Sequence, residues 1–277
     1  MRYSIIIPTF NRQQMTSSLI EQLLKENIPD SEILVIDDRS YDDTAENIAR
    51  KYTDVKVLVN DRRRFVAHSR NRGIRESRGE TLVFIDSDIS FEEGMLGSFL
   101  SDLNPGFNFP VTKWEDGTEM PKGTSSIFAL QRYLLARFND DYFDENIGIY
   151  SDDTDFFTKA KIFGVDFAHK DKYIFTHHKK PNASKKYNYS DFEYYMGYKN
   201  NLYIAIKFAG LAKGYTFLRP FARLIKDIGL ILANIATLRF KRAYLLLKAI
   251  GWNMLNIRAC LLSRKKIAEK IVLQRQL

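Results

Sequence analysis

Two aspartates separated by a single serine stand where an apolar segment of the chain ends. The segment Leu82–Ile85 is short and apolar, which is typical of a buried strand. Residues i and i+2 of an extended chain point the same way, so Asp86 and Asp88 would converge on one cation. Hard divalent cations such as Mn²⁺ and Mg²⁺ bind carboxylate oxygens and often coordinate substrate phosphates at the same time. The same three residues also fit a solvated turn, so the rest of the chain must decide between the two interpretations.

Strand-like and helix-like segments alternate through the first 90 residues. Strands are predicted at Tyr3–Ile7, Glu32–Ile36, Val55–Val59 and Thr81–Ile85, and helices at Arg12–Glu26, 42–52 and Val66–Glu76. This alternation predicts an α/β fold with a mostly parallel, Rossmann-like central sheet that is covered on both faces. Ligands of such sheets bind at the carboxyl ends of the strands, where Asp86 and Asp88 fall.

The middle of the chain is less regular. Helices are predicted over 127–138 and over 151–163, with Ser151 as the N-cap of the second. A strand is predicted at Tyr173–Thr176, directly before His177 and His178. From about residue 190 onward the pattern is helical.

The net charge of +8 is unevenly distributed along the chain. Residues 198–277 carry 16 Lys or Arg and two acids, a balance of +14, whereas residues 1–197 carry 26 basic and 32 acidic side chains. We therefore expect a catalytic domain over 1–197 and a helical, basic, amphipathic C-terminal region over 198–277. An apolar stripe in that region consists of Leu246, Leu247, Ile250, Met254, Ile257 and Leu261. Such a stripe either binds an anionic membrane surface or packs as ordinary core.

Cysteine usage and hydropathy bear on location. The single cysteine, Cys260, excludes an internal disulfide framework and fits a reducing compartment. The N-terminal apolar run is too short for a signal peptide, and no run reaches 18 apolar residues. We expect a cytoplasmic protein that binds peripherally to the inner face of the cell membrane. No aromatic–basic module for nucleic acid accompanies the basic region, so no nucleic-acid partner is expected.

The order and spacing of five segments resemble those of the family-2 glycosyltransferases, which have the GT-A fold and use nucleotide-sugar donors. The resemblance covers roughly residues 3–180. The segments are Ile5–Arg12, Leu34–Ser40 followed by Asp42-Asp43-Thr44, Ser69–Ile74, Phe84–Asp88, and Asp144-Glu145 followed by Ser151–Phe157.

The resemblance implies donor-binding roles for seven residues. They are Pro8, Thr9, Asn11, Asp38, Arg70, Asp86 and Ser87. The Asp38 carboxylate can accept a hydrogen bond from the imino N–H of a base, which fits uracil or thymine and favours UDP or dTDP. Arg70 matches an arginine that faces the diphosphate, for which a guanidinium is well shaped.

The resemblance also implies a metal site and a general base. Asp88 would bind Mn²⁺ or Mg²⁺ together with Asp86, and His177 or His178 stands where many GT-A enzymes carry a metal-binding histidine. The family's E-D-x-D segment falls on Asp152 and Asp153. Asp153 would be the base that takes the proton from the acceptor hydroxyl, and Asp152, which replaces the usual glutamate, is the alternative. Both acids would equally suit the first turn of a helix.

The function implied is that of an inverting, metal-dependent glycosyltransferase. It would move one sugar from a nucleoside-diphosphate sugar to a hydroxyl of a glycan or glycolipid, as in polysaccharide biosynthesis. The chain has no Q-x-x-R-W motif, which processive synthases share, so transfer of a single sugar is expected. One alternative is a sugar-nucleotide nucleotidyltransferase, but no Gly-rich phosphate loop follows the first strand. The other is a non-catalytic protein that binds the membrane surface.

Overall fold

The structure is a computed structural model that describes residues 1–178 and 190–276. The chain divides into two compact units. The first comprises Met1–Gly148 and Val165–Ser184, and the second comprises Ile149–Gly164 and Lys185–Leu277. The division into domains at residue 197 stays a prediction. The segment Ile149–Gly164 belongs to the same unit as the C-terminal helices.

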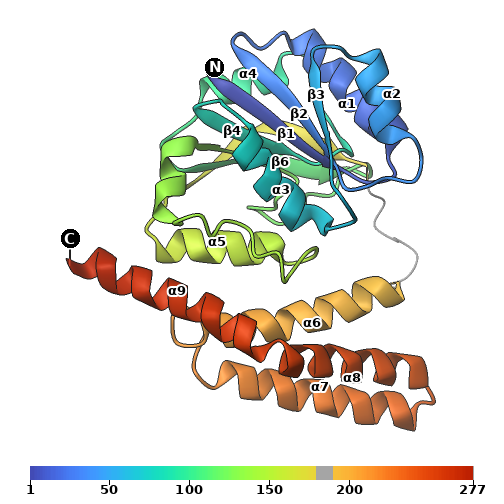
Figure 1. Cartoon of the computed structure of the whole chain (residues 1–277), viewed down its shortest axis with the longest axis vertical. Coiled ribbons are helices and arrows are strands. Elements are labelled where there is room, and N and C mark those ends of the chain that lie inside the picture. The colour runs from blue at the N-terminus through green and yellow to red at the C-terminus, as the bar shows by residue number, and fades with distance from the viewer. Residues whose placement is uncertain (179–189, 277) are drawn as a thin grey trace. The chain divides into compact units, whose positions relative to one another are not determined.

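The first unit is built on an eight-stranded sheet with the order β3-β2-β1-β4-β7-β6-β8-β5 (Figure 1). Neighbours among β1 to β4 are parallel, β7 is antiparallel to both of its neighbours, and β5 is antiparallel to β8. The strands are β1 Tyr3–Thr9, β2 Ser31–Asp37, β3 Val55–Val59, β4 Thr81–Ile85, β5 Ile89–Ser90, β6 Phe107–Trp114, β7 Ile127–Gln131 and β8 Phe167–His177. The mostly parallel α/β sheet predicted from the sequence is confirmed.

Helices cover both faces of this sheet. They are α1 Gln13–Glu26, α2 Thr44–Lys51, α3 Phe65–Glu76, α4 Met95–Ser101 and the 3₁₀ helix η1 Arg132–Arg137. Ile5 and Ile7 of β1 face a core to which α1, α2 and α4 contribute. Ile6 points to the other face, as alternation along a strand requires, and there it meets Gly73 of α3.

The parallel register brings the carboxyl ends of the strands to one edge of the sheet. Thr9, the last residue of β1, pairs with Asp37, the last residue of β2, and β4 ends at Ile85. The residues that follow these strands therefore lie along a common edge, which is the geometry that the D-x-D spacing needs.

The prediction of a helix over 127–138 is wrong for residues 127–131. Ile127–Gln131 forms β7, which pairs with β4 and β6, and only the 3₁₀ helix η1 follows it. The run is short and apolar, and such runs fit a buried strand or a buried helix equally well by periodicity. The open edge of β4 decides the outcome, because its backbone groups need partners.

The second unit is helical. Its helices are α5 Asp152–Ile162, α6 Asp191–Phe208, α7 Arg219–Ala236, α8 Phe240–Leu255 and α9 Ile257–Gln276. Helix α6 contacts α7, α8 and α9, and Ile231, Ala243 and Leu246 form a small buried core between α7 and α8. Among the residues described, no single helix is long and apolar enough to cross a membrane. The pair α8 and α9, bent by 60°, passes that test jointly on length and composition alone.

The predicted apolar stripe is divided by that bend. Leu246 is fully buried and Ile250 packs against the small core, whereas Leu247 and Met254 are exposed. Ile257 and Leu261 belong to α9. The α8 part of the stripe is thus split between helix-packing core, at Leu246 and Ile250, and exposed surface, at Leu247 and Met254.

Replacement of Gly73 by alanine is expected to destabilise the first unit. A Cβ atom at Gly73 would lie 2.3 Å from Ile6 Cγ2, so α3 or β1 would have to shift. Overpacking of this kind costs about 1–3 kcal/mol, and we expect Gly73→Ala to lower the free energy of urea unfolding by that amount. Gly97→Ala in α4 is the matched control, because its Cβ would meet no atom closer than 3.4 Å. Equal stability of the two variants would contradict this close packing.

Candidate active site

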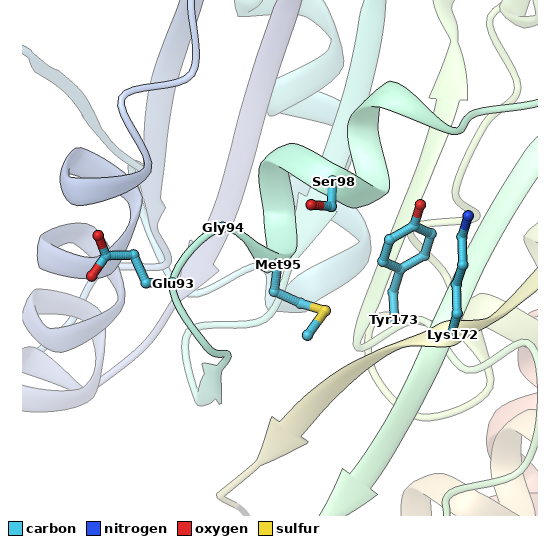
Figure 2. A pocket seen from close by; sticks show the side chains of 6 residues that line it. All are labelled: Glu93, Gly94, Met95, Ser98, Lys172 and Tyr173. Carbon is cyan, nitrogen blue, oxygen red and sulfur yellow. The ribbon is translucent and has the colours of Figure 1, made fainter.

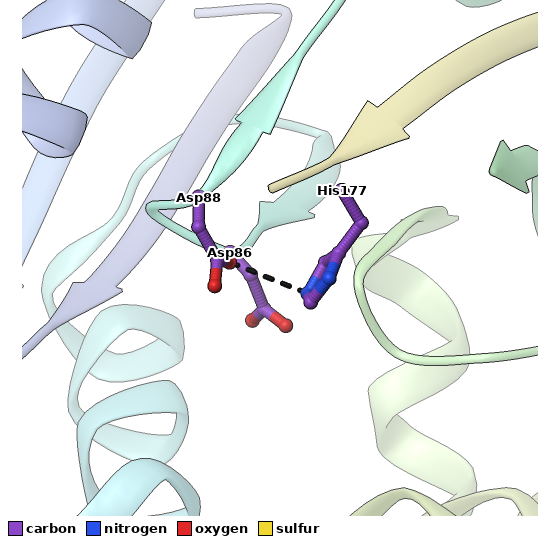
Figure 3. A group of neighbouring side chains, drawn as sticks. All are labelled: Asp86, Asp88 and His177. Atoms are coloured by element: carbon purple, nitrogen blue, oxygen red, sulfur yellow. Dashed lines mark ion pairs between the residues drawn. The ribbon is translucent and has the colours of Figure 1, made fainter. Parts of the chain in front are cut away.

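Asp86, Asp88 and His177 form one compact group at the carboxyl edge of the sheet. Their ligand atoms all lie within 4.8 Å of one another. Asp88 Oδ1 lies 3.3 Å from His177 Nε2, and Figure 3 shows the carboxylate facing the imidazole ring. Asp88 and His177 are buried, and Asp86 is half-buried. The pairing of β5 with β8 sets Ile89 beside His177 and so brings a late strand to the D-x-D segment.

Two arginines from different elements neutralise this group. Arg70 of α3 donates from Nη2 to Asp86 Oδ1 at 2.9 Å and to the Ser125 carbonyl at 3.0 Å. Arg12, in the loop after β1, donates from Nη1 to Asp88 Oδ2 at 2.5 Å. Arg70 is almost wholly buried, although charged side chains are rarely buried unless paired.

The electrostatics of Asp86 follow from this crowding. Burial raises the pKa of Asp86 above its usual value, and the neighbouring Asp88 raises it further, while Arg70 opposes both effects. A bound cation would favour the ionised carboxylates. Asp88 Oδ1 is buried and accepts no hydrogen bond from the described residues, which leaves a ligand atom available. The donor set of two carboxylates and one imidazole suits Mn²⁺ or Mg²⁺.

The two adjacent histidines have different environments. His177 joins the aspartates and contacts the Trp114 ring edge-on, with ring centroids 4.9 Å apart. His178 is held elsewhere, with Nδ1 2.7 Å from Glu115 Oε1 and Nε2 2.6 Å from Ser90 Oγ. Successive residues of a strand point to opposite faces, so only one of them can face the aspartates.

Asp38 fixes the loop that leads into α3. Its carboxylate accepts hydrogen bonds from Asn60 Nδ2 at 2.8 Å, from the Arg64 N–H at 2.7 Å and from the Phe65 N–H at 2.7 Å. Phe65 has φ 66°, a conformation that bulky residues rarely adopt. An ionised carboxyl group has about four acceptor sites, so Asp38 retains room for one further donor.

The other predicted donor-binding residues line the start of the same edge. Thr9 is buried, with Oγ1 2.8 Å from Thr16 Oγ1, and Pro8 and Ser87 are buried as well. Asn11 is exposed and joins two loops. Its N–H donates to Ser40 Oγ at 2.8 Å, and its Oδ1 accepts from the Tyr41 N–H at 2.7 Å.

Asp152 and Asp153 open α5, which belongs to the second unit. Asp152 is buried, and Asp153 Oδ1 accepts a hydrogen bond from the Thr154 N–H at 2.6 Å. Ser151 occupies the N-cap position with φ 71°, but its side chain makes no cap hydrogen bond. Its predicted place at the start of the helix is right, and the capping bond that motivated the prediction is missing.

Asp155 anchors α5 to α6 within this unit. Its carboxylate lies 3.1 Å from Lys159 Nζ and 2.6 Å from Lys207 Nζ, and all three side chains are fully buried. Removal of one partner from such a buried network leaves an uncompensated charge. The network fixes the first turn of α5 and therefore the position of Asp152 and Asp153 in the second unit.

Sequence reasoning missed Arg12 as a member of the site. Its signal was available, because Arg12 follows Asn11 directly in the loop after the first strand. Helical periodicity instead assigned it to the first helix, which begins one residue later. Asp37 was also missed. It is buried, Oδ1 accepts from the Ser40 N–H, and Oδ2 has no hydrogen-bond partner among the residues described.

A separate pocket of about 370 Å³ lies between α4 and β8. Figure 2 shows Lys172 and Tyr173 of β8 beside Met95 and Ser98 of α4. None of the predicted site residues lines it. Tyr173 and Lys172 both contact Asp102, so these two lining side chains already have a structural role.

Curated glycosyltransferases are among the proteins that this chain resembles in sequence. A glucosyltransferase of Campylobacter jejuni that acts on GalNAc(5)-diNAcBac-PP-undecaprenol is 26% identical over 155 residues, which is 51% of this chain and 50% of that protein. The glucosyltransferase WfgD of Escherichia coli, named for α-D-GlcNAc-diphosphoundecaprenol, is 33% identical over 87 residues, 31% of this chain and 34% of that protein. The chain thus spans at most about half the length of these relatives.

Solved structures share the fold. TarS residues 1–349 of S. aureus, in complex with UDP-GlcNAc, superimposes with a TM-score of 0.62 at 19% identity, covering 100% of this chain and 92% of that one. The mannosyltransferase PcManGT of Pyrobaculum calidifontis, in complex with GDP-Man and Mn²⁺, gives 0.57 at 18% identity, covering 98% and 86%. The GT-A fold expected from the sequence is confirmed.

The match to a known family lies on the part of the chain that builds this edge. The sequence model described as glycosyl transferase family 2 matches residues 4–115. That range contains Asp38, Arg70 and the Asp86–Asp88 pair. Residues 4–115 thus match glycosyl transferase family 2, which the sequence analysis expected.

Proposed function

We propose that the protein is an inverting, metal-dependent glycosyltransferase that moves one sugar from a nucleoside-diphosphate sugar to an acceptor hydroxyl. The observation that carries the proposal is the Asp86–Asp88–His177 group, which lies at the carboxyl edge of a family-2 sheet between Arg12 and Arg70. Ligands bind at this edge in open α/β sheets, and the donor set fits a hard divalent cation.

Arg12, Arg70 and the acidic pair would together hold the diphosphate. When bound, Mn²⁺ or Mg²⁺ would offset charge on the departing nucleoside diphosphate. In the described structure Arg70 already contacts Asp86, so a phosphate ligand would enter a site whose positive charges are preorganised. Asp38, Thr9 and Asn11 surround the loops where the nucleoside would bind, and one free acceptor site on Asp38 favours UDP or dTDP.

Asp153 is our proposed general base, with Asp152 as the alternative. As the acceptor oxygen attacks the anomeric carbon, the bond to the diphosphate breaks and the carboxylate takes the hydroxyl proton. Attack from the side opposite the leaving group inverts the anomeric configuration. Asp153 is only half-buried, as a residue that meets an incoming hydroxyl must be, whereas Asp155 is sealed between two lysines.

The acceptor we propose is a lipid-linked glycan presented at the inner face of the cell membrane. Two similar proteins are named for undecaprenol-linked substrates. The +14 balance of residues 198–277 suits an anionic membrane surface. Location and acceptor are therefore proposed together, as parts of one polysaccharide-building step.

Nucleotide binding is expected to depend on metal through Asp88. With UDP or dTDP and Mn²⁺ the protein should melt at a higher temperature, since ligand at 100 times its Kd adds about 2.7 kcal/mol of stability. Asp88→Ala removes the buried ligand oxygen, so the Mn²⁺-dependent part of the shift and the sugar-nucleotide turnover should disappear. Glu93→Ala, which removes an exposed carboxylate nearby, is the control and should behave as wild type. Full activity in the presence of a chelator would refute metal dependence.

Substitution of the base is expected to separate chemistry from binding. Asp153→Asn keeps the shape of the side chain and removes its basicity, so the transfer rate should fall by at least about 10²-fold. The thermal shift with nucleotide and Mn²⁺ should stay as in wild type. An active Asp153→Asn beside an inactive Asp152→Asn would move the assignment to Asp152. Activity in both variants would show that the first turn of α5 is purely structural.

A further inference from the structure

Helix α7 exposes a continuous uncharged face along its whole length. Phe221, Ile225 and Leu232 are 66%, 71% and 63% exposed. The face also includes smaller residues, so that no charged side chain interrupts it. Its large members are Phe221, Ile225, Ile228, Leu232 and Ile235, with alanines and Gly229 between them.

The opposite side of α7 is fixed by packing. Ile231 is buried against Ala243 and Leu246 of α8, and α7 also contacts α6. Asp227 is buried on this side and forms an ion pair with Arg223, with Nε 3.1 Å from Oδ1. The rotation of the helix about its axis is therefore set within its own unit, and the uncharged face is the side that is left outward.

The charge around the face has one sign. Asp227 is the only acid of α7, and it is buried, so the exposed surface of the helix carries Arg219 and Lys226 and no negative charge. Arg239, in the turn before α8, is exposed as well, whereas the exposed Lys241 at the start of α8 forms an ion pair with Asp191 of α6. An apolar strip with a cationic border is the pattern of helices that lie in the surface of an anionic bilayer.

We propose that α7 lies in the plane of an anionic membrane surface, with its uncharged face among the lipid chains and Arg219 and Lys226 at the headgroups. This inference rests on the membrane-bound acceptor of the proposed function. It assigns the docking to α7, whereas the sequence stripe that begins at Leu246 is divided, with Leu246 and Ile250 in the helical core and its other members exposed. Eighteen residues give the helix a length of about 27 Å, enough for many simultaneous lipid contacts.

A second copy of the chain fits this face less well. Two such faces brought together would bring their cationic borders together, which is unfavourable at short range. Contiguous exposed apolar faces on proteins mark interaction sites, which indicates a partner for this one. Anionic lipid meets both demands, because it supplies apolar chains and negative headgroups at once.

The test is co-sedimentation of the full chain with vesicles of phosphatidylcholine alone or with 30% phosphatidylglycerol. The variant Phe221→Gln/Ile225→Gln/Leu232→Gln should partition at least about 100-fold more weakly than wild type, because three large apolar contacts are lost. Glutamine is a good helix former, so α7 itself is kept. Tyr133→Gln is the matched control, since Tyr133 is 65% exposed in the other unit, and it should bind as wild type.

Electrostatics are tested by a second variant. Lys226→Gln/Arg239→Gln should weaken binding to the anionic vesicles at low salt and change binding to the neutral vesicles little, because the two lost charges attract only anionic headgroups. The difference from wild type should shrink at high salt, since salt screens the attraction. If the triple variant does not fold by circular dichroism, Ile225→Gln alone replaces it, with a loss of at least about fivefold expected.

Wild-type binding by the folded triple variant would overturn the assignment to α7. So would a wild-type dimer, seen by sedimentation velocity, that the triple variant dissociates while neither protein binds vesicles. The thermal shift with nucleotide and Mn²⁺ separates this inference from the proposed function. A triple variant that loses vesicle binding and keeps that shift supports α7 docking. Vesicle binding through α7 in a protein that never responds to nucleotide would leave the docking intact and remove the transferase proposal.

Discussion

Two carboxylates crowded beside one imidazole are tolerable in a folded protein only when positive charge is held next to them. At about 4 Å, two like charges repel by about 4 kcal/mol at the effective dielectric of a protein surface. Arg70 and Arg12 offset this repulsion around Asp86 and Asp88. The rest of the first unit can be understood as the framework that brings these charges together. Parallel strands end at one edge, α3 approaches β1 closely through Gly73, and β8 returns to place His177 at the same point.

The loop before α3 shows how the chain accommodates a strained residue at the start of a helix. This loop leads through Arg64 to Phe65, the first residue of α3. Phe65 adopts a left-handed conformation that costs a bulky residue about 1–3 kcal/mol. The Asp38 carboxylate holds both backbone N–H groups, and charge-assisted hydrogen bonds of this kind are strong enough to offset the strain. Asp38 therefore supports the loop that carries Arg70 into place, in addition to any contact with a nucleoside.

The second unit combines two opposite uses of charge. Within it, the Lys159–Asp155–Lys207 network ties α5 to α6 at full burial, which makes the first turn of α5 a fixed platform for Asp152 and Asp153. Over residues 198–277 of this unit only Asp227 and Glu269 are acidic, against 16 bases. The buried network gives positional precision, and the excess of bases gives attraction to an anionic surface.

Local sequence determined the order of strands and helices as far as the fourth strand, the carboxylates at the end of that strand and the basic character of the C-terminal region, because periodicity and charge are properties of neighbouring residues. It did not predict the strand β6. Only the tertiary structure decided whether 127–131 is helix or strand, since the backbone partners come from β4 and β6. It also decided that His177 and not His178 faces the aspartates, through the register of β8 with β5. It brought in Arg12, and it turned Leu246 inward while leaving α7 exposed, because burial depends on the helix that packs against each face.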